Sequence, residues 1–251
     1  MVKILGKNKA QGSPSGSPPS VAPGVSPPGN EIESLYERFP WLYAICRDHL
    51  FRDDTDKIVA ALWPAGAPSS GETLLELGCG PGFYARRLAG RFSHLMVTGI
   101  DRSERQLRRA RVAAQRGEGL SNCTFEQGDA SDLERQSASV EAVVVSRLFF
   151  ILSEREKAIS EIHRVLKPGG RCFIAEPRSA LRASVPLRAM WVLAALSAFS
   201  GKPYREYWEL EKTSVLAAGE FRELIRSRPW RRERCWKDRW YQYAVCEKGS
   251  G

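Results

Sequence analysis

The sequence predicts an α/β fold built around a mostly parallel sheet. Short apolar runs alternate with helical patterns between residues 72 and 177, an order typical of βα units. The run Val140–Val145 is apolar except for Glu141, as expected of a strand that helices cover on both faces. Gly78, Gly80 and Gly82 stand between an apolar run and a helical pattern, so they predict a tight turn from a strand into a helix.

The predicted elements follow one another in a regular order. Strands are expected where apolar runs are too short for helices, at residues 72–77, 95–100, 123–126, 140–145 and 172–175, and in a closing hairpin of residues 230–236 and 240–246. Helices are expected where apolar residues recur every three or four positions, at residues 82–91, from residue 103, from residue 153 and near 216–227.

Two of these helices carry signals for their ends. Ser103 with Gln106 has the spacing of a capping box, in which the serine hydroxyl accepts a backbone N–H and the glutamine reaches back. Ser153 with Glu156 repeats that spacing, so the later helix is expected to start there. The segment Lys167–Gly170 is expected to end this helix, because proline cannot continue it and glycine can supply a left-handed C-cap.

The N-terminal part divides into a tail and the start of a folded domain. Residues 1–30 predict a disordered tail, because they are rich in Ser, Pro and Gly and show no periodicity. From Glu31 the pattern, which includes Tyr36 and Tyr43, predicts short helices before the sheet. We therefore expect one domain over residues 31–249.

The βα alternation lapses between residues 179 and 215, which predicts a helical insertion after the fifth strand. Its uncharged stretch 189–201 would form a helix about 20 Å long, too short for a bilayer core. We expect a lid over the site or ordinary cover for the sheet, and a peripheral membrane contact is left open.

Composition limits the classes of function. The six cysteines form no C-x-x-C pair and match no histidine spacing, which argues against a zinc site, any other metal centre and a disulfide framework. We find no signal-peptide pattern and no apolar run of about 18 residues, so a cytoplasmic protein is expected. Three of the nine net positive charges stand in the first nine residues, and the modest remainder does not favour a nucleic-acid partner.

The glycine spacing narrows the ligand. A dinucleotide fingerprint would require glycine at position 83, where Phe83 stands. The pattern present is E-x-G-x-G-x-G, from Glu76 to Gly82, so NAD and FAD are not favoured.

Four motifs in order, Glu76–Gly82, Gly99–Asp101, Gln127–Ala130 and Ile162–Arg171, resemble those of the class I S-adenosylmethionine-dependent methyltransferases. This resemblance implies a seven-stranded, mostly parallel, Rossmann-like methyltransferase fold and S-adenosyl-L-methionine as methyl donor. The glycine loop and the segment Arg164–Gly170 look most like the small-molecule branch, which includes quinone, sterol and phospholipid methyltransferases.

The resemblance also implies a cofactor site. Asp101 would accept the ribose hydroxyls, Asp129 the adenine amine, and Glu76 would orient the loop or bind the methionine ammonium through water. The residues implied are Glu76, Gly78, Cys79, Gly80, Gly82, Asp101, Arg102, Asp129, Ala130 and Ser146.

The acceptor side is less defined: the candidates for a catalytic residue are Arg147, Tyr204 and Tyr207, and Glu176 is a further candidate for an acceptor-site group. Arg147 follows the strand after which this family places residues beside the transferable methyl, so it could bind an acidic acceptor or pair with Glu176. His163 is predicted to be a surface or packing residue. Methyl transfer is an in-line displacement that needs alignment above all, and it needs a base only if the acceptor must lose a proton.

Residues 221–240 contain eight Arg or Lys interleaved with Trp230, Trp236 and Trp240. This pattern is typical of a single-stranded nucleic-acid surface, but also of a half-buried hairpin with Trp and Cys inward, which we favour. The expected function is methyl transfer to a small, fairly hydrophobic acceptor. The alternatives are an RNA or protein methyltransferase that uses this hairpin, and a catalytically idle cofactor-binding partner protein.

Overall fold

The computed structural model describes residues 53–116, 119–178 and 215–250, all of which belong to the larger of two compact units, Glu33–Gly251. The predicted tail, Tyr36 and Tyr43 lie outside the described residues, as do Tyr204, Tyr207 and all but residue 215 of the predicted insertion.

The described part of the chain contains seven strands and five helices. The strands are β1 (Thr73–Leu77), β2 (Met96–Asp101), β3 (Cys123–Gln127), β4 (Val140–Ser146), β5 (Leu166–Pro177), β6 (Trp230–Lys237) and β7 (Tyr241–Lys248). The helices are α3 (Thr55–Leu62), α4 (Phe83–Arg91), α5 (Glu104–Ala114), α6 (Arg155–Val165) and α8 (Ala218–Arg226).

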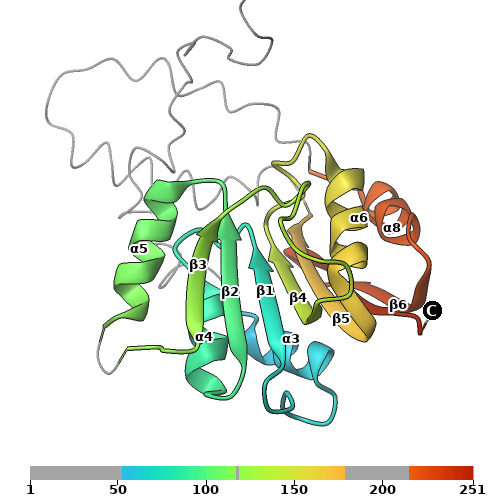
Figure 1. Ribbon diagram of the computed structural model, residues 1–251. Helices are drawn as coiled ribbons and strands as arrows, with labels where there is room; N and C mark the ends of the chain where they lie inside the picture. The colour runs from blue at the N-terminus through green and yellow to red at the C-terminus, as the bar shows by residue number, and fades with distance from the viewer. Residues whose placement is uncertain (1–52, 117–118, 179–214, 251) are drawn as a thin grey trace, which may run out of the picture. The chain divides into compact units, whose positions relative to one another are not determined.

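The strands form one sheet in the order β3-β2-β1-β4-β5-β7-β6 (Figure 1). The first five in sequence are parallel, and β7 is antiparallel to both β5 and β6. The order reverses at β1, so the carboxyl ends of β1, β2 and β4 meet at the place where α/β sheets bind ligands. The predicted α/β fold with a seven-stranded, mostly parallel sheet is confirmed.

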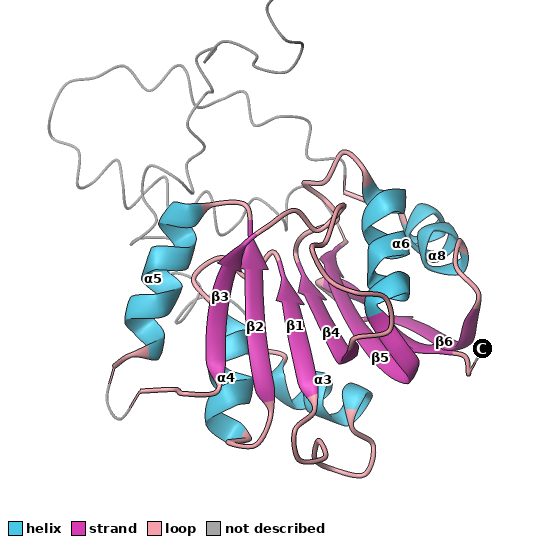
Figure 2. Ribbon diagram, viewed as in Figure 1, coloured by secondary structure: helices cyan, strands magenta, loops and turns pink. Residues whose placement is uncertain are grey.

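Two apolar cores lie on opposite faces of the sheet, because successive strand residues point to opposite sides. On one face, Leu74 and Val144 pack with α3, α4 and α5. On the other, Leu75 and Val143 pack with α6 and α8. Figure 2 shows α3 and α4 behind the strands and α6 in front of them. Helices on both faces explain why β4 is apolar apart from Glu141 and Ser146.

The capping predictions had different outcomes. The Ser103 hydroxyl accepts the Gln106 N–H at 3.4 Å and caps α5, as predicted. The predicted return bond from Gln106 is wrong, because the Ser103 N–H donates to Asp101 instead. Ser153 does not cap α6, because the helix begins one residue later with Glu154 at the N-cap, where no side-chain cap bond forms. The glutamate instead pairs with Lys157.

The predicted glycine C-cap of α6 is also wrong. The helix ends at Val165, and the next residue is already extended and opens β5. Gly169, at φ +78, therefore lies within β5, where the register with β4 shifts. At Gly170 a β-carbon would lie 2.9 Å from the Glu141 carbonyl oxygen, so this irregular segment passes too close to β4 for a side chain.

The closing hairpin is confirmed, but its predicted alternation holds only in part. Trp230 is buried and Trp236 is half-buried, whereas Trp240 at the turn is 42% exposed. Arg231–Arg234 are all exposed on the edge strand β6. Charged side chains on an edge strand also oppose pairing with another sheet, so this basic stretch has a structural explanation.

Candidate functional site

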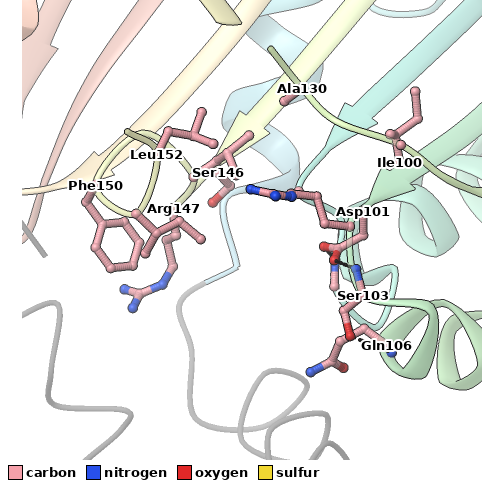
Figure 3. A pocket seen from close by; sticks show the side chains of 15 residues that line it. Ile100, Asp101, Ser103, Gln106, Ala130, Ser146, Arg147, Phe150 and Leu152 are labelled. Carbon is pink, nitrogen blue, oxygen red and sulfur yellow. Dashed lines mark hydrogen bonds between the residues drawn. The ribbon is translucent and has the colours of Figure 1, made fainter. Parts of the chain in front are cut away.

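A cavity of about 220 Å³ lies at the carboxyl ends of β1, β2 and β4, where the sequence placed its site (Figure 3). Six of the predicted residues line it: Gly78, Gly80, Asp101, Arg102, Ala130 and Ser146. Arg147, which was predicted for the acceptor side, also lines the cavity. The other eight lining residues were not predicted as site residues: Ile100, Ser103, Gln106, Gly128, Leu148, Phe150, Ile151 and Leu152.

The glycine turn is fixed to β2 by a carboxylate. Gly78 and Gly80 have φ values of +66° and +53°, a backbone conformation that glycine adopts without a steric penalty. The Gly80 N–H donates to Asp101 Oδ2 at 2.7 Å, and the Ser103 N–H donates to Asp101 Oδ1 at 2.9 Å. Asp101 therefore joins the turn after β1 to the start of α5 and forms part of the cavity wall.

Gly82 and Cys79 do not line the cavity. Gly82 is the N-cap of α4 at φ +73, and a β-carbon there would lie 2.5 Å from the Phe125 ring. The absence of a side chain at Gly82 thus permits packing rather than ligand approach. The Cys79 side chain is 4% exposed, and its Sγ atom lies 2.9 Å from the position of a β-carbon on Gly99.

Glu76 acts on the helix that follows the turn. Its carboxylate is 3% exposed, and its Oε2 accepts the Ala85 N–H at 2.7 Å in the first turn of α4. Because the first N–H groups of a helix have no partner within the helix, this bond fixes where α4 begins. Of the two roles predicted for Glu76, this geometry favours orientation of the loop.

Asp129 lies just after β3, beside the cavity. Its Oδ1 accepts the Ser131 N–H at 2.8 Å, and Arg102 Nε lies 3.8 Å from Oδ2. The hydroxyl of Ser131 lowers the pKa of the Asp129 carboxyl, and the Ser131 N–H and Arg102 act in the same direction. Asp129 is thus an ionised acceptor, while its neighbour Ala130 contributes an apolar part of the wall.

Arg147 lines the cavity on the side away from Asp101 (Figure 3). Its N–H donates to the Ala175 carbonyl at 2.9 Å, and its φ of +59° is left-handed. The guanidinium Nη1 donates to the Tyr241 hydroxyl at 2.9 Å. The guanidinium lies over the Phe150 ring, with Cζ 5.4 Å from the ring centre. The sequence could not show this use of Tyr241, which is 94 residues further along the chain.

Glu176 holds the loop that follows Arg147. Its Oε1 accepts the N–H groups of Leu148 and Phe149 at 2.8 Å each, and its Oε2 accepts that of Phe150 at 3.3 Å. Burial raises the pKa of this carboxyl to about 7, although the three N–H groups and Arg147 favour its charged form. The strand-terminal position of Glu176 was a signal, but it suggested an acceptor-site group rather than an anchor for the loop.

His163 lies on α6, and its ring packs edge-on against Trp230 with ring centres 4.9 Å apart. Burial lowers its pKa, which favours the neutral ring. The predicted packing role is confirmed.

The cavity has the residues that S-adenosylmethionine would need. The carboxylate of Asp101 can accept hydroxyl hydrogens, the glycine turn allows close backbone approach, and Ile100 and Ala130 provide apolar contact. Arg147, Phe150 and Leu152 lie on the side away from Asp101 (Figure 3), which leaves that side for a second molecule.

Comparisons with known proteins agree with this geometry. Residues 74–170 match the family model described as a methyltransferase domain. The chain is 33% identical over 158 residues to a demethylmenaquinone methyltransferase of Clavibacter sepedonicus, an alignment that covers 62% of this chain and 60% of that protein. It is 35% identical over 122 residues to 27-O-demethylrifamycin SV methyltransferase of Amycolatopsis mediterranei, which covers 49% of this chain and 43% of that protein.

The matched part of the chain thus spans less than two thirds of the length of these relatives. Among solved structures, the chain is similar to Haemonchus contortus phosphoethanolamine N-methyltransferase 2 in complex with S-adenosyl-L-methionine, with a TM-score of 0.64 and 15% identity over 89% of this chain and 61% of that one. This structural similarity supports the α/β fold described above. Among the described helices, none is long and apolar enough to cross a membrane.

Proposed function

We propose, on the premise that the chain carries a class I S-adenosylmethionine-dependent methyltransferase domain, that it transfers a methyl group to a small, fairly hydrophobic acceptor. The observation that carries the proposal is the hydrogen bond from the Gly80 N–H to Asp101, which holds a glycine turn and a carboxylate side by side in the wall of the same cavity. The two relatives named above methylate small molecules by name, which supports this class of acceptor.

We propose that Asp101 accepts the ribose hydroxyls of the methyl donor. An ionised carboxylate has about four acceptor positions, so it can hold the N–H groups of Gly80 and Ser103 and also bind a ligand. The backbone of residues 78–80 would contact the methionine part, and Ala130 with Asp129 the adenine. Gly82 and Glu76 would act indirectly, by packing and by orienting α4.

In the proposed reaction, the acceptor forms a bond to the methyl carbon while the bond from that carbon to the sulfonium sulfur breaks, and the electron pair stays on sulfur. Positive charge disperses during this step, so the protein contributes alignment and a cavity with little water. A base is needed only for an acceptor that is still protonated when it binds.

The test is calorimetric titration of S-adenosylmethionine and S-adenosylhomocysteine into the wild type, Asp101→Asn and Asp56→Asn. We expect micromolar binding that Asp101→Asn weakens at least tenfold, about 1.4 kcal/mol. Asp56 is 91% exposed and pairs with Arg91 at the far end of α4, so Asp56→Asn controls for the loss of one carboxylate and should bind normally. A wild type that binds neither compound would refute the proposal.

If binding is found, labelled methyl transfer into a cell extract, separated into lipid, small-molecule, RNA and protein fractions, identifies the acceptor class. Label in RNA or protein would favour the alternative that uses the basic hairpin. Binding without label in any fraction would favour the idle partner protein. A cytoplasmic location remains part of the proposal.

A further inference from the structure

Arg147 stands in a conformation that its residue type disfavours. Its φ of +59° is left-handed, which costs an L-residue other than glycine or asparagine about 1 kcal/mol. Such strain persists where the surroundings impose it, and it often accompanies a functional role. Here the Arg147 N–H bonds to the Ala175 carbonyl and the next three N–H groups bond to the Glu176 side chain, so the end of β5 imposes it.

The side chain of Arg147 is held in place by a hydroxyl and an aromatic ring, and it also interacts electrostatically with the Glu176 carboxylate. The Tyr241 hydroxyl accepts from Nη1 at 2.9 Å, and the Phe150 ring lies beside the guanidinium, 5.4 Å away at its centre. Arg147 is 9% exposed and still lines the cavity. A guanidinium that is pre-oriented and mostly shielded from water binds a planar anion more strongly than one on an open surface.

The position of this arginine in the cavity defines what it could bind. Figure 3 shows Arg147 and Phe150 on one side of the cavity and Asp101 and Ser103 on the other. If Asp101 holds the ribose, as the proposed function states, the Arg147 side faces the molecule that receives the methyl group. The Phe150 ring and Leu152 offer it an apolar contact.

Resting on the proposed function, we propose that Arg147, oriented by Tyr241, selects a flat acceptor that carries an ionised oxygen, such as a phenolate, an enolate or a carboxylate. An acceptor that binds as an anion has already given its proton to water, so the site needs no base. Arg147 is in this sense a specificity-determining residue, and Tyr241 is a positioning residue.

The test uses 2-naphthoate and its neutral isostere 2-naphthamide as probes, titrated into protein saturated with S-adenosylhomocysteine. We expect the wild type to bind the anion at least tenfold more tightly than the amide. Arg147→Asn, which tolerates the left-handed backbone, should reduce this ratio to within twofold of unity. Arg147→Lys should keep part of it, and Tyr241→Phe should lower it about threefold.

The matched control is Arg232→Asn, which removes an exposed arginine from the edge strand β6 and should leave the ratio unchanged. All variants should bind S-adenosylhomocysteine within twofold of the wild type. Equal affinity of the wild type for both probes, including no binding of either, overturns this inference alone, as does an anion preference that survives in Arg147→Asn. Absence of S-adenosylhomocysteine binding by the wild type refutes the proposed function itself.

Discussion

Gly82→Ala should destabilise the protein by about 3 kcal/mol. About 1 kcal/mol arises because alanine must adopt the left-handed φ of +73°. About 2 kcal/mol more arises from overpacking, because the new β-carbon would lie 2.5 and 2.6 Å from two carbons of the Phe125 ring and 3.1 Å from the Ala110 β-carbon. The Phe125 ring is buried and belongs to the core under α4 and α5, so it cannot move aside freely.

The assay is urea unfolding at neutral pH, with Gly71→Ala as the matched control. Gly71 has φ +79 and no atom within 4 Å of a β-carbon, so it isolates the backbone cost of about 1 kcal/mol. In a Phe125→Leu background, which removes the clashing ring atoms, the cost of Gly82→Ala should fall to that same value.

Two results would refute this account of Gly82. One is a Gly82→Ala protein no less stable than Gly71→Ala. The other is a cost that Phe125→Leu does not reduce. Because Gly82 does not line the cavity, the folded variant should also bind S-adenosylhomocysteine within about threefold of the wild type, whereas a glycine needed for ligand approach would lose binding without losing stability.

Two further substitutions test groups that hold the fold. The pKa of Glu176 is raised from 4.5 to about 7 in the folded state, so its contribution to stability is complete below about pH 4.5 and is lost as the pH rises through 7. Urea unfolding at pH 5 and pH 8 should show that Glu176→Gln removes a decline of about 2 to 3 kcal/mol, and an unchanged pH dependence would contradict this. Asn122→Ala should lower the free energy of unfolding by about 2 kcal/mol in the same assay at neutral pH, because the buried Nδ2 donates to three carbonyl oxygens. A loss no larger than that caused by Ser121→Ala at the exposed neighbouring position would show that those carbonyls find other partners.

The sheet could be predicted from the sequence because its signals are local. The run Val140–Val145, apolar except for Glu141, is typical of a strand covered on both faces in an α/β protein. The observed β4 extends it by one residue. The Ser103 cap was predicted for the same reason, since the hydroxyl and the N–H that it accepts are three residues apart. Ser153 has the same local spacing, yet the chain starts α6 one residue later, a shift that local pattern does not resolve.

The parts that could not be predicted depend on contacts between distant residues. Gly82 has its role because Phe125, 43 residues later, packs against it. The position of the Arg147 side chain depends on Tyr241, and that of its loop on Glu176. No periodicity or spacing in one sequence encodes such pairs, because each depends on which strands become neighbours in the sheet.

The acids near the carboxyl ends of the strands illustrate this limit most clearly. Glu76, Asp101, Asp129 and Glu176 all occupy positions where the sequence suggests ligand groups, and all of them accept backbone N–H groups of adjoining segments. Of these four, only Asp101 also lines the cavity. Loss of activity on replacing such an acid therefore does not identify a ligand contact, because a displaced loop has the same effect. Ligand contact and loop support can be told apart when affinity and stability are measured on the same variant. Replacement of Asp101 should weaken S-adenosylhomocysteine binding beyond any loss of stability. Glu176→Gln should change the pH dependence of unfolding and leave the affinity for S-adenosylhomocysteine within about threefold of the wild type.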